Sequence, residues 1–278
     1  MADTPPRSAD FAADTAVEPA GGGRYTATVT ERWNVLGDTA PNGGYLMAIA
    51  GRAMALTVDR PDPVAVTAHY LRPATVGAAE VVTEIVKEGR RLATVQAALR
   101  QDGEEKVRLL GAFGDLAALE GPTHDHRPAP DLPPREELID ANAAADERGG
   151  FAPQILRRFD IHLPPEMMGW TVGRPLGRGE ISGYCRFAGG EPMTTIGLLA
   201  LADAFPPAVF NMGVEVGWTP TVELTVQIRK RPAPGFLRTR FTTNSVTDGL
   251  LEEDGELWDS EGDLVALSRQ TALVHRPS

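Results

Sequence analysis

The chain has 278 residues, a length that accommodates two domains of average size, and 42% of them are hydrophobic, which excludes disorder over the whole chain. Its 38 acidic and 27 basic residues give a net charge of −11, which argues against general binding of nucleic acid or of anionic membranes. The single cysteine, Cys185, excludes an internal disulfide and a cysteine-rich zinc site. Because no apolar run is long enough to span a bilayer or to form a secretory signal, we expect a cytoplasmic protein without a membrane partner.

The first half of the chain begins with small and polar residues, so residues 1–23 are predicted to form a flexible tail. Apolar and polar residues alternate over 24–35, which predicts a strand. Turn-forming residues then precede an apolar run at 45–57, whose length favours a buried helix. Four further strand-like runs, separated by turns, cover residues 64–71, 79–87, 92–100 and 106–113.

Prolines and charges dominate residues 116–150, which we interpret as a linker. The second half then follows the order of the first, with an apolar helix predicted at 193–205. Strand-like runs before and after this helix cover residues 155–163, 180–188, 222–228, 236–244, 250–260 and 264–275.

Two turn motifs indicate that the halves are copies of one unit. Arg72-Pro73-Ala74 returns 159 residues later as Arg231-Pro232-Ala233. Gln101-Asp102-Gly103 is matched at the same distance by Ser260-Glu261-Gly262. We therefore predict an internal duplication.

The duplication divides the chain into an N-terminal unit at 24–115 and a C-terminal unit at 151–278. In each unit a helix is followed by four antiparallel strands, and the sheet must wrap around the helix to bury it. This pattern predicts an α+β protein with a double hotdog fold. Two outer sheet edges remain in such a protein, so self-association into a homo-oligomer is expected.

Short motifs in both halves resemble those of one enzyme family. Asn42-Gly43-Gly44 precedes the first helix, His69-Tyr70-Leu71-Arg72-Pro73 ends a strand, and Asp203, Thr221 and Gln270 lie in the second half. In their order and spacing they resemble the acyl-CoA thioesterase II family, the double-hotdog thioesterases. The resemblance implies an acyl-CoA substrate and a hydrolytic water oriented jointly by Asp203, Thr221 and Gln270. It implies neither a cofactor nor a metal.

Asp203 also stands out without the resemblance, because it is the only charged residue of the run at 193–205. Burial among apolar neighbours would raise the pKa of its carboxyl group toward that of a general base. The alternative is a carboxylate at the end of the helix that faces solvent.

Thr221 and Gln270 have weaker signals of their own. A hydroxyl at the start of a strand can hold a water or cap a loop, and threonine is common in strands. Gln270 has small neighbours on its face, and its amide can donate and accept hydrogen bonds at once. The alternative for Gln270 is a solvated strand residue.

The duplication provides an internal comparison for the candidate catalytic residues. A shift of 159 residues places Gly111 opposite Gln270, and Asp62 or Pro63 opposite Thr221. The first half therefore lacks the three residues, and we expect one catalytic site in each chain.

Candidate substrate-binding groups lie at the start of the first helix. The free N–H groups near Asn42, Gly43 and Gly44 could bind a thioester oxygen, although Asn42 also fits a simple helix cap. Arg90-Arg91 and Arg229-Lys230-Arg231 could contact the phosphates of coenzyme A or be solvated turns.

We therefore expect hydrolysis of acyl-CoA to a free fatty acid and coenzyme A. A non-catalytic protein that binds acyl-CoA or an acyl carrier is one alternative, and a hotdog-fold hydratase or dehydratase is the other. The latter reaction commonly uses a histidine base, and none of the five histidines lies at a predicted helix start. Acyl chain length, branching, the thioester carrier and the number of subunits are left open.

Overall fold

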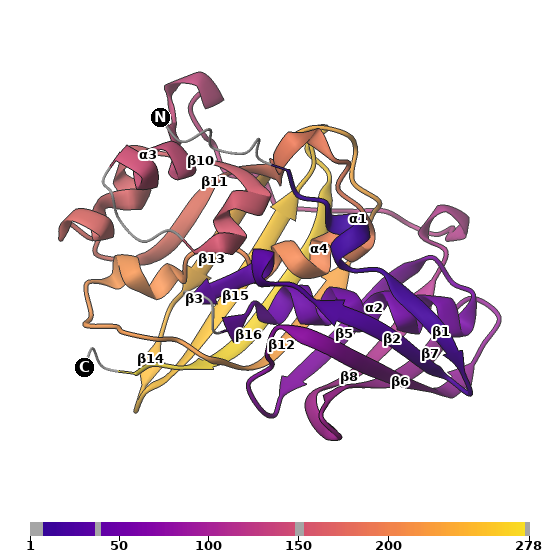
Figure 1. Ribbon diagram of the computed structural model, residues 1–278. Helices are drawn as coiled ribbons and strands as arrows, with labels where there is room; N and C mark the ends of the chain where they lie inside the picture. The colour runs from indigo at the N-terminus through magenta and orange to yellow at the C-terminus, as the bar shows by residue number, and fades with distance from the viewer. Residues whose placement is uncertain (1–7, 37–39, 148–152, 276–278) are drawn as a thin grey trace.

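The computed structural model describes residues 8–36, 40–147 and 153–275, and Figure 1 shows their arrangement. The first half contains helices α1 (Phe11–Asp14) and α2 (Gly43–Val58) and strands β1 (Val17–Gly21), β2 (Arg24–Val29), β3 (Asn34–Leu36), β4 (Ala40–Pro41), β5 (Asp62–Tyr70), β6 (Gly77–Glu88), β7 (Ala93–Gln101) and β8 (Glu104–Gly114). The second half contains α3 (Ala141–Glu147), α4 (Thr195–Leu201), β9 (Ile139–Asp140), β10 (Phe159–Leu163), β11 (Gly179–Phe187), β12 (Thr221–Ile228), β13 (Leu237–Thr243), β14 (Val246–Thr247), β15 (Leu250–Trp258) and β16 (Leu264–Leu273). None of these helices is both long and apolar enough to cross a lipid bilayer.

The main sheet has 14 strands in the order β1-β2-β6-β7-β8-β5-β12-β16-β15-β13-β11-β10-β9, with β14 attached to β15. The six strands from β1 to β5 in this order form one half, and the strands from β12 onward form the other. Both α2 and α4 lie on the same side of the sheet (Figure 1). The expected α+β double hotdog fold is therefore confirmed.

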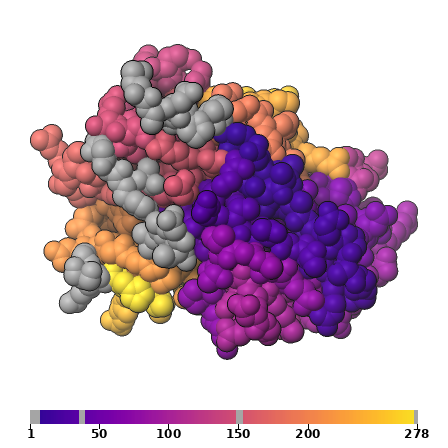
Figure 2. Space-filling model, in the orientation of Figure 1, coloured from indigo at the N-terminus to yellow at the C-terminus, as the bar shows by residue number. Residues whose placement is uncertain are grey.

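The two halves join where β5 pairs antiparallel with β12. Thr67 lies directly opposite Thr225, and their hydroxyl oxygens are 2.8 Å apart. Val66 pairs with Val226 and Ala68 pairs with Leu224, so the register is symmetric about this threonine pair. The corresponding strands of the two units thus pair with each other, and Figure 2 shows the two halves in contact.

Helix α2 is apolar on nearly all sides because the sheet and α4 both cover it. The side chain of Asn42 caps the helix by accepting a hydrogen bond from the Tyr45 N–H at 2.9 Å. Gly44 allows the two helices to approach closely, since a Cβ there would stand only 2.7 Å from the carbonyl oxygen of Ala200. The start of α2 is thereby fixed against the end of α4.

The prediction of a flexible tail is wrong for residues 8–23, the part of 1–23 that the structure describes. Strand β1 pairs with β2, and the side chain of Phe11 in α1 is buried. Its ring stacks on Phe187 of the second half with 4.8 Å between the centroids. A single aromatic residue in a polar stretch thus anchors this segment across the two halves.

The predicted linker is also shorter than expected. Residues 119–128 are exposed and have no helix or strand. Strand β9, however, pairs with β10, and the amide of Asn142 in α3 donates to the Phe159 carbonyl at 2.9 Å. Residues 139–147 therefore pack as part of the second half.

Candidate functional site

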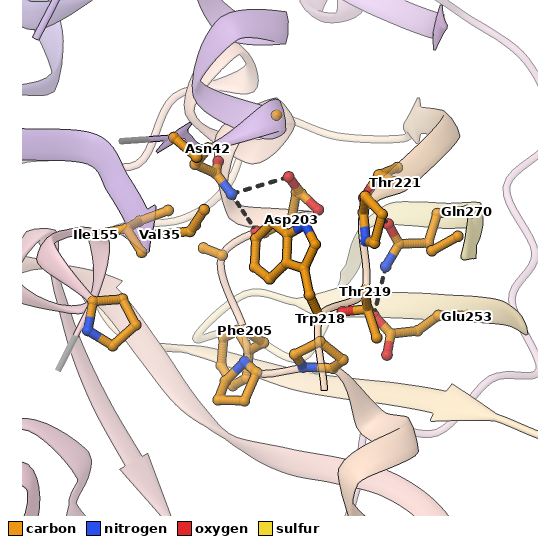
Figure 3. A pocket seen from close by; sticks show the side chains of 18 of the residues that line it. Val35, Asn42, Ile155, Asp203, Phe205, Trp218, Thr219, Thr221, Glu253 and Gln270 are labelled. Atoms are coloured by element: carbon orange, nitrogen blue, oxygen red, sulfur yellow. Dashed lines mark hydrogen bonds between the residues drawn. The ribbon is translucent and has the colours of Figure 1, made fainter. Parts of the chain in front are cut away.

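A cavity of about 920 Å³ opens where the two halves meet. Its wall is mainly apolar, with aromatic side chains from Phe205, Phe210 and Phe241. Polar side chains gather at one end, and Figure 3 shows how those of Asn42, Asp203, Thr221, Glu253 and Gln270 lie. Tyr70 also lines the cavity. A large apolar chamber with a few convergent polar groups is typical of a small-molecule site.

Asp203 lies just beyond the end of α4, at the start of α2. The predicted helix at 193–205 ends earlier, at Leu201, and the following turn directs the carboxylate toward α2. Its Oδ2 accepts hydrogen bonds from the Gly44 N–H at 2.9 Å and from the Asn42 amide at 3.0 Å. The same amide donates to the Asp203 carbonyl at 2.7 Å. Residues from both halves therefore position this carboxylate.

Burial raises the pKa of the Asp203 carboxyl group to about 6. Hydrogen bonds from the backbone N–H of Gly44 and the side chain of Asn42 lower the pKa and partly oppose this effect. No cation among the described residues forms an ion pair with Asp203. A carboxyl group with this pKa is ionised at neutral pH and is still a better base than an exposed aspartate.

Thr221, Gln270 and Glu253 form a hydrogen-bonded row across three neighbouring strands, β12, β16 and β15. The Thr221 hydroxyl donates to Gln270 Oε1 at 3.0 Å. Gln270 Nε2 in turn donates to Glu253 Oε1 at 2.9 Å. The row fixes the orientation of the Gln270 amide, since each end of the amide has its own partner.

Glu253 is a residue of the site that the sequence did not reveal. It is buried, its Oε2 accepts a hydrogen bond from the Ala208 N–H, and burial raises the pKa of its carboxyl group to about 7. The only signal was alternation along β15, where Leu251, Glu253 and Leu257 share the inward face. Glu252 and Asp254 on either side conceal this signal, because the acid is one of three in a row.

The structure brings the three predicted catalytic residues to one end of the cavity. Asp203 lies between Asn42 and Thr221 in Figure 3, with Gln270 beyond Thr221. No hydrogen bond in the described part of the chain joins Asp203 directly to Thr221 or Gln270. The carboxylate and the Thr221–Gln270 pair thus face the cavity from two sides.

The start of α2 differs from the predicted oxyanion site. Asn42 and Gly43 line the cavity, but the donors of Asn42 and Gly44 are directed to Asp203. The positive end of the helix therefore supports the carboxylate, and its hydrogen-bonding capacity is already used. Asn42, Gly43 and Gly44 hold the candidate base in place.

The equivalent position in the first half is apolar and filled. Gly111 lies between Val66 and Val95 in the sheet, as Gln270 lies between Leu224 and Glu253. A Cβ on Gly111 would stand 2.9 Å from the ring of Phe113 and 3.1 Å from the methyl group of Met54. Among the described residues of the first half, the space that a side chain at Gly111 would need is occupied.

Of the arginines predicted to contact coenzyme A, Arg231 forms ion pairs with Asp62 and Asp115. Arg72 was not among those predicted contacts, but it lines the cavity.

Two domain models of one family match the chain. The N-terminal domain of acyl-CoA thioesterases matches residues 10–114, and the C-terminal domain of acyl-CoA thioesterases matches residues 125–274. The chain belongs to the acyl-CoA thioesterase family. The resemblance found in the sequence is thereby confirmed, and this thioesterase is a thioester hydrolase.

Solved structures and curated sequences extend the match along the whole thioesterase. A protein from Thermobifida fusca YX, itself classed provisionally as a thioesterase II, is 33% identical, with a TM-score of 0.85 and coverage of 98% of this chain and 99% of that one. A hot dog fold protein of unknown function from Alicyclobacillus acidocaldarius is 21% identical, with a TM-score of 0.82 and coverage of 96% and 98%. An uncharacterised protein of Mycobacterium tuberculosis is 26% identical over 90% of each chain.

Proposed function

We propose that the protein hydrolyses acyl-CoA thioesters to a free fatty acid and coenzyme A, with Asp203 as the general base. The observation that carries this proposal is the partly buried Asp203 carboxyl group, which lines the cavity without a cationic partner among the described residues and has a pKa that desolvation raises to about 6. An apolar chamber of about 920 Å³ beside it suits the acyl chain.

In the proposed reaction Asp203 accepts a proton from a water while the water oxygen bonds to the thioester carbon. The carbonyl π electrons move to the carbonyl oxygen. When the carbonyl re-forms, the carbon–sulfur bond breaks, and the departing thiolate recovers the proton from Asp203. Water and acyl-CoA are thus converted to fatty acid and coenzyme A without a covalent enzyme intermediate.

Thr221 and Gln270 are proposed to position the attacking water. Because the Thr221 hydroxyl donates to Gln270 Oε1, the lone pairs of its oxygen are free to accept a hydrogen bond. Glu253 holds the Gln270 amide in the orientation that this arrangement needs. Such positioning lowers the entropic part of the barrier.

Two substitutions test the proposal, with thiol release from a ladder of acyl-CoA substrates as the measurement. Asp203→Asn keeps the shape but removes the base, and we expect a loss of about 10²–10⁴ in kcat. Gln270→Ala removes positioning only, and we expect a loss of about 10–10³. The ladder also reports the preferred chain length.

Asp254→Asn serves as the matched control. Asp254 neighbours Glu253 in β15 but pairs with Arg269 at the surface, so the same chemical change should leave turnover intact. Near wild-type turnover of Asp203→Asn, with folding verified by circular dichroism, would refute the mechanism. Acyl-CoA binding by the wild type without turnover would favour an acyl-binding protein instead.

A further inference from the structure

The donors that contact Asp203, and those of the neighbouring Thr221–Gln270–Glu253 row, are used within the protein. The Asn42 amide and the Gly44 N–H donate to Asp203, and the Thr221 hydroxyl donates to Gln270. Gln270 itself donates to Glu253. Water attack on a thioester places negative charge on the carbonyl oxygen, and that oxygen needs a donor that is not already engaged.

Tyr70 carries such a donor. It is the last residue of β5, and its side chain lines the cavity on the inward face, which it shares with the buried Val66 and Ala68. Its hydroxyl oxygen is buried and has no hydrogen-bond partner in the described part of the chain.

The ring of Tyr70 lies beside the candidate base. A Cβ on Gly43 would stand 2.9 Å from the ring carbon that bears the hydroxyl and also 2.9 Å from Asp203 Oδ2. Two groups that are both this close to one point are near neighbours. The absence of a side chain at Gly43 leaves the space in which the phenol and the carboxylate approach each other.

The charge around Tyr70 keeps its hydroxyl a donor. Burial, followed by the negative charges of Asp203 and Glu223, raises the pKa of the phenol well above its usual value. The group therefore keeps its proton at neutral pH, where Asp203 is ionised.

Trp170 carries the other buried donor without a partner among the described side chains of the cavity wall. Its ring packs on Phe210 in the second half, with 4.8 Å between the centroids. Of the two, only Tyr70 is placed beside Asp203.

We propose that the Tyr70 hydroxyl donates a hydrogen bond to the thioester carbonyl oxygen and stabilises the oxyanion formed by water attack. This inference rests on the proposed acyl-CoA hydrolysis. In this arrangement Tyr70, from the first half, contacts the carbonyl oxygen. Asp203, from the second half, activates the water that attacks the carbonyl carbon. An unpartnered buried hydroxyl destabilises the free protein, and substrate would supply the missing acceptor.

Tyr70→Phe tests this role, because it removes the hydroxyl and keeps the ring. We expect kcat to fall by about 10²–10³, the effect typical of losing one oxyanion donor, with little change in KM. We also expect the melting temperature to be unchanged or higher, since the hydroxyl that is lost had no partner. A trifluoromethyl ketone analogue of acyl-CoA, whose hydrated form resembles the tetrahedral intermediate, should bind more weakly by a similar factor.

Tyr45→Phe is the matched control. Tyr45 is another buried tyrosine of the first half, but its hydroxyl donates to the Asp14 carbonyl at 2.8 Å and accepts from the Thr30 N–H at 3.2 Å. The same change there should lower the melting temperature and leave kcat near the wild-type value. The two tyrosines should thus show opposite patterns.

The outcomes separate the inference from the function on which it rests. A wild type that releases no thiol would overturn the proposed function. Hydrolysis by the wild type with an equal kcat in Tyr70→Phe would overturn the role of Tyr70 alone. A Tyr70→Phe protein that loses stability together with activity would show a structural hydroxyl and would also overturn it.

Discussion

Two carboxylates near helix starts, the buried Asp62 and the partly buried Asp203, differ in the groups that contact them. Burial alone would raise the pKa of Asp62, but Arg231, the Leu116 N–H and the Thr195 hydroxyl together lower it. Among the described residues, Asp203 at the start of α2 receives hydrogen bonds from neutral donors only, and desolvation raises its pKa. The presence of one arginine therefore separates a structural carboxylate from a candidate base.

The acid side of the pH profile should report Asp203. Because the base must be ionised, kcat/KM is expected to fall about tenfold per pH unit below the apparent pKa. That value should lie near 6 to 7, since the pKa is about 6 for Asp203 and about 7 for the neighbouring Glu253, and the two carboxyls titrate as a pair. Rates measured from pH 4.5 to 8.5 test this, and an activity that stays constant down to pH 4.5 would contradict it.

Stability should depend on pH in the opposite sense. A carboxyl whose pKa is raised by folding binds more protons in the folded state, so its contribution to stability is lost as pH rises from about 4 to about 6. Asp203→Asn is therefore expected to have a higher melting temperature than the wild type at pH 8 and to lose this advantage near pH 4. If the melting temperatures of Asp203→Asn and the wild type differ by the same amount at pH 8 and at pH 4, a desolvated charge at this position is excluded.

Asp203 could be singled out from the sequence because a lone charge in an apolar run is conspicuous. Glu253 was concealed by the acids beside it. Its burial depends on which face of β15 is turned toward the core, and the sequence does not specify that face. Tyr70 was visible in its motif, but an aromatic residue at the end of a strand usually packs in the core. Whether a tyrosine hydroxyl has a partner depends on side chains that are distant in sequence.

At the scale of elements, the strands were predicted closely because their apolar alternation and turns are local signals. The start of β10 was placed too early, since residues 154–158 form a 3₁₀ helix before the strand begins at Phe159. The predicted end of α4 was also wrong. Apolar composition continues to Phe205, but turns follow Leu201, and they bring Asp203 back to α2.

The close contact of α2 with α4 predicts a strong effect of Gly44→Ala. The new Cβ would meet two backbone oxygens, at 2.7 Å on Ala200 and 2.9 Å on Leu199, and backbone cannot move aside cheaply. We expect a loss of about 1–3 kcal/mol in the free energy of unfolding, measured by urea denaturation. Turnover should fall too, because the Gly44 N–H that holds Asp203 would shift.

Gly51→Ala in the same helix is the matched control. Its Cβ would meet the end of the Leu199 side chain at 2.8 Å, which can rotate away, and alanine favours the helix. A mild effect is expected there. If both variants lose equal stability, close backbone approach is not what makes Gly44 necessary.

At the scale of the whole molecule, one sheet passes through both halves and its outer edges are short. The terminal strands are β1, which contains Pro19, and β9, which has two residues. Short edges and proline both discourage strand pairing between molecules. The expected homo-oligomer stays a prediction, and edge pairing is a weak reason for it.

The exposed segment at 119–128 is a tether, and catalysis should not require it. The β5–β12 ladder and the bonds between Asn42 and Asp203 hold the halves together without it. A protease site inserted there and then cut should leave two fragments that elute together and retain turnover. Dissociation or immediate inactivation on cleavage would contradict this.

The tether should matter during folding instead. A covalent connection raises the effective concentration of one half near the other to the millimolar range, so docking becomes intramolecular. Separately refolded fragments would have to find each other by collision, and recovery of activity would then depend on protein concentration. Turnover would therefore serve as a direct readout of assembly, because the proposed reactive centre combines residues from both halves.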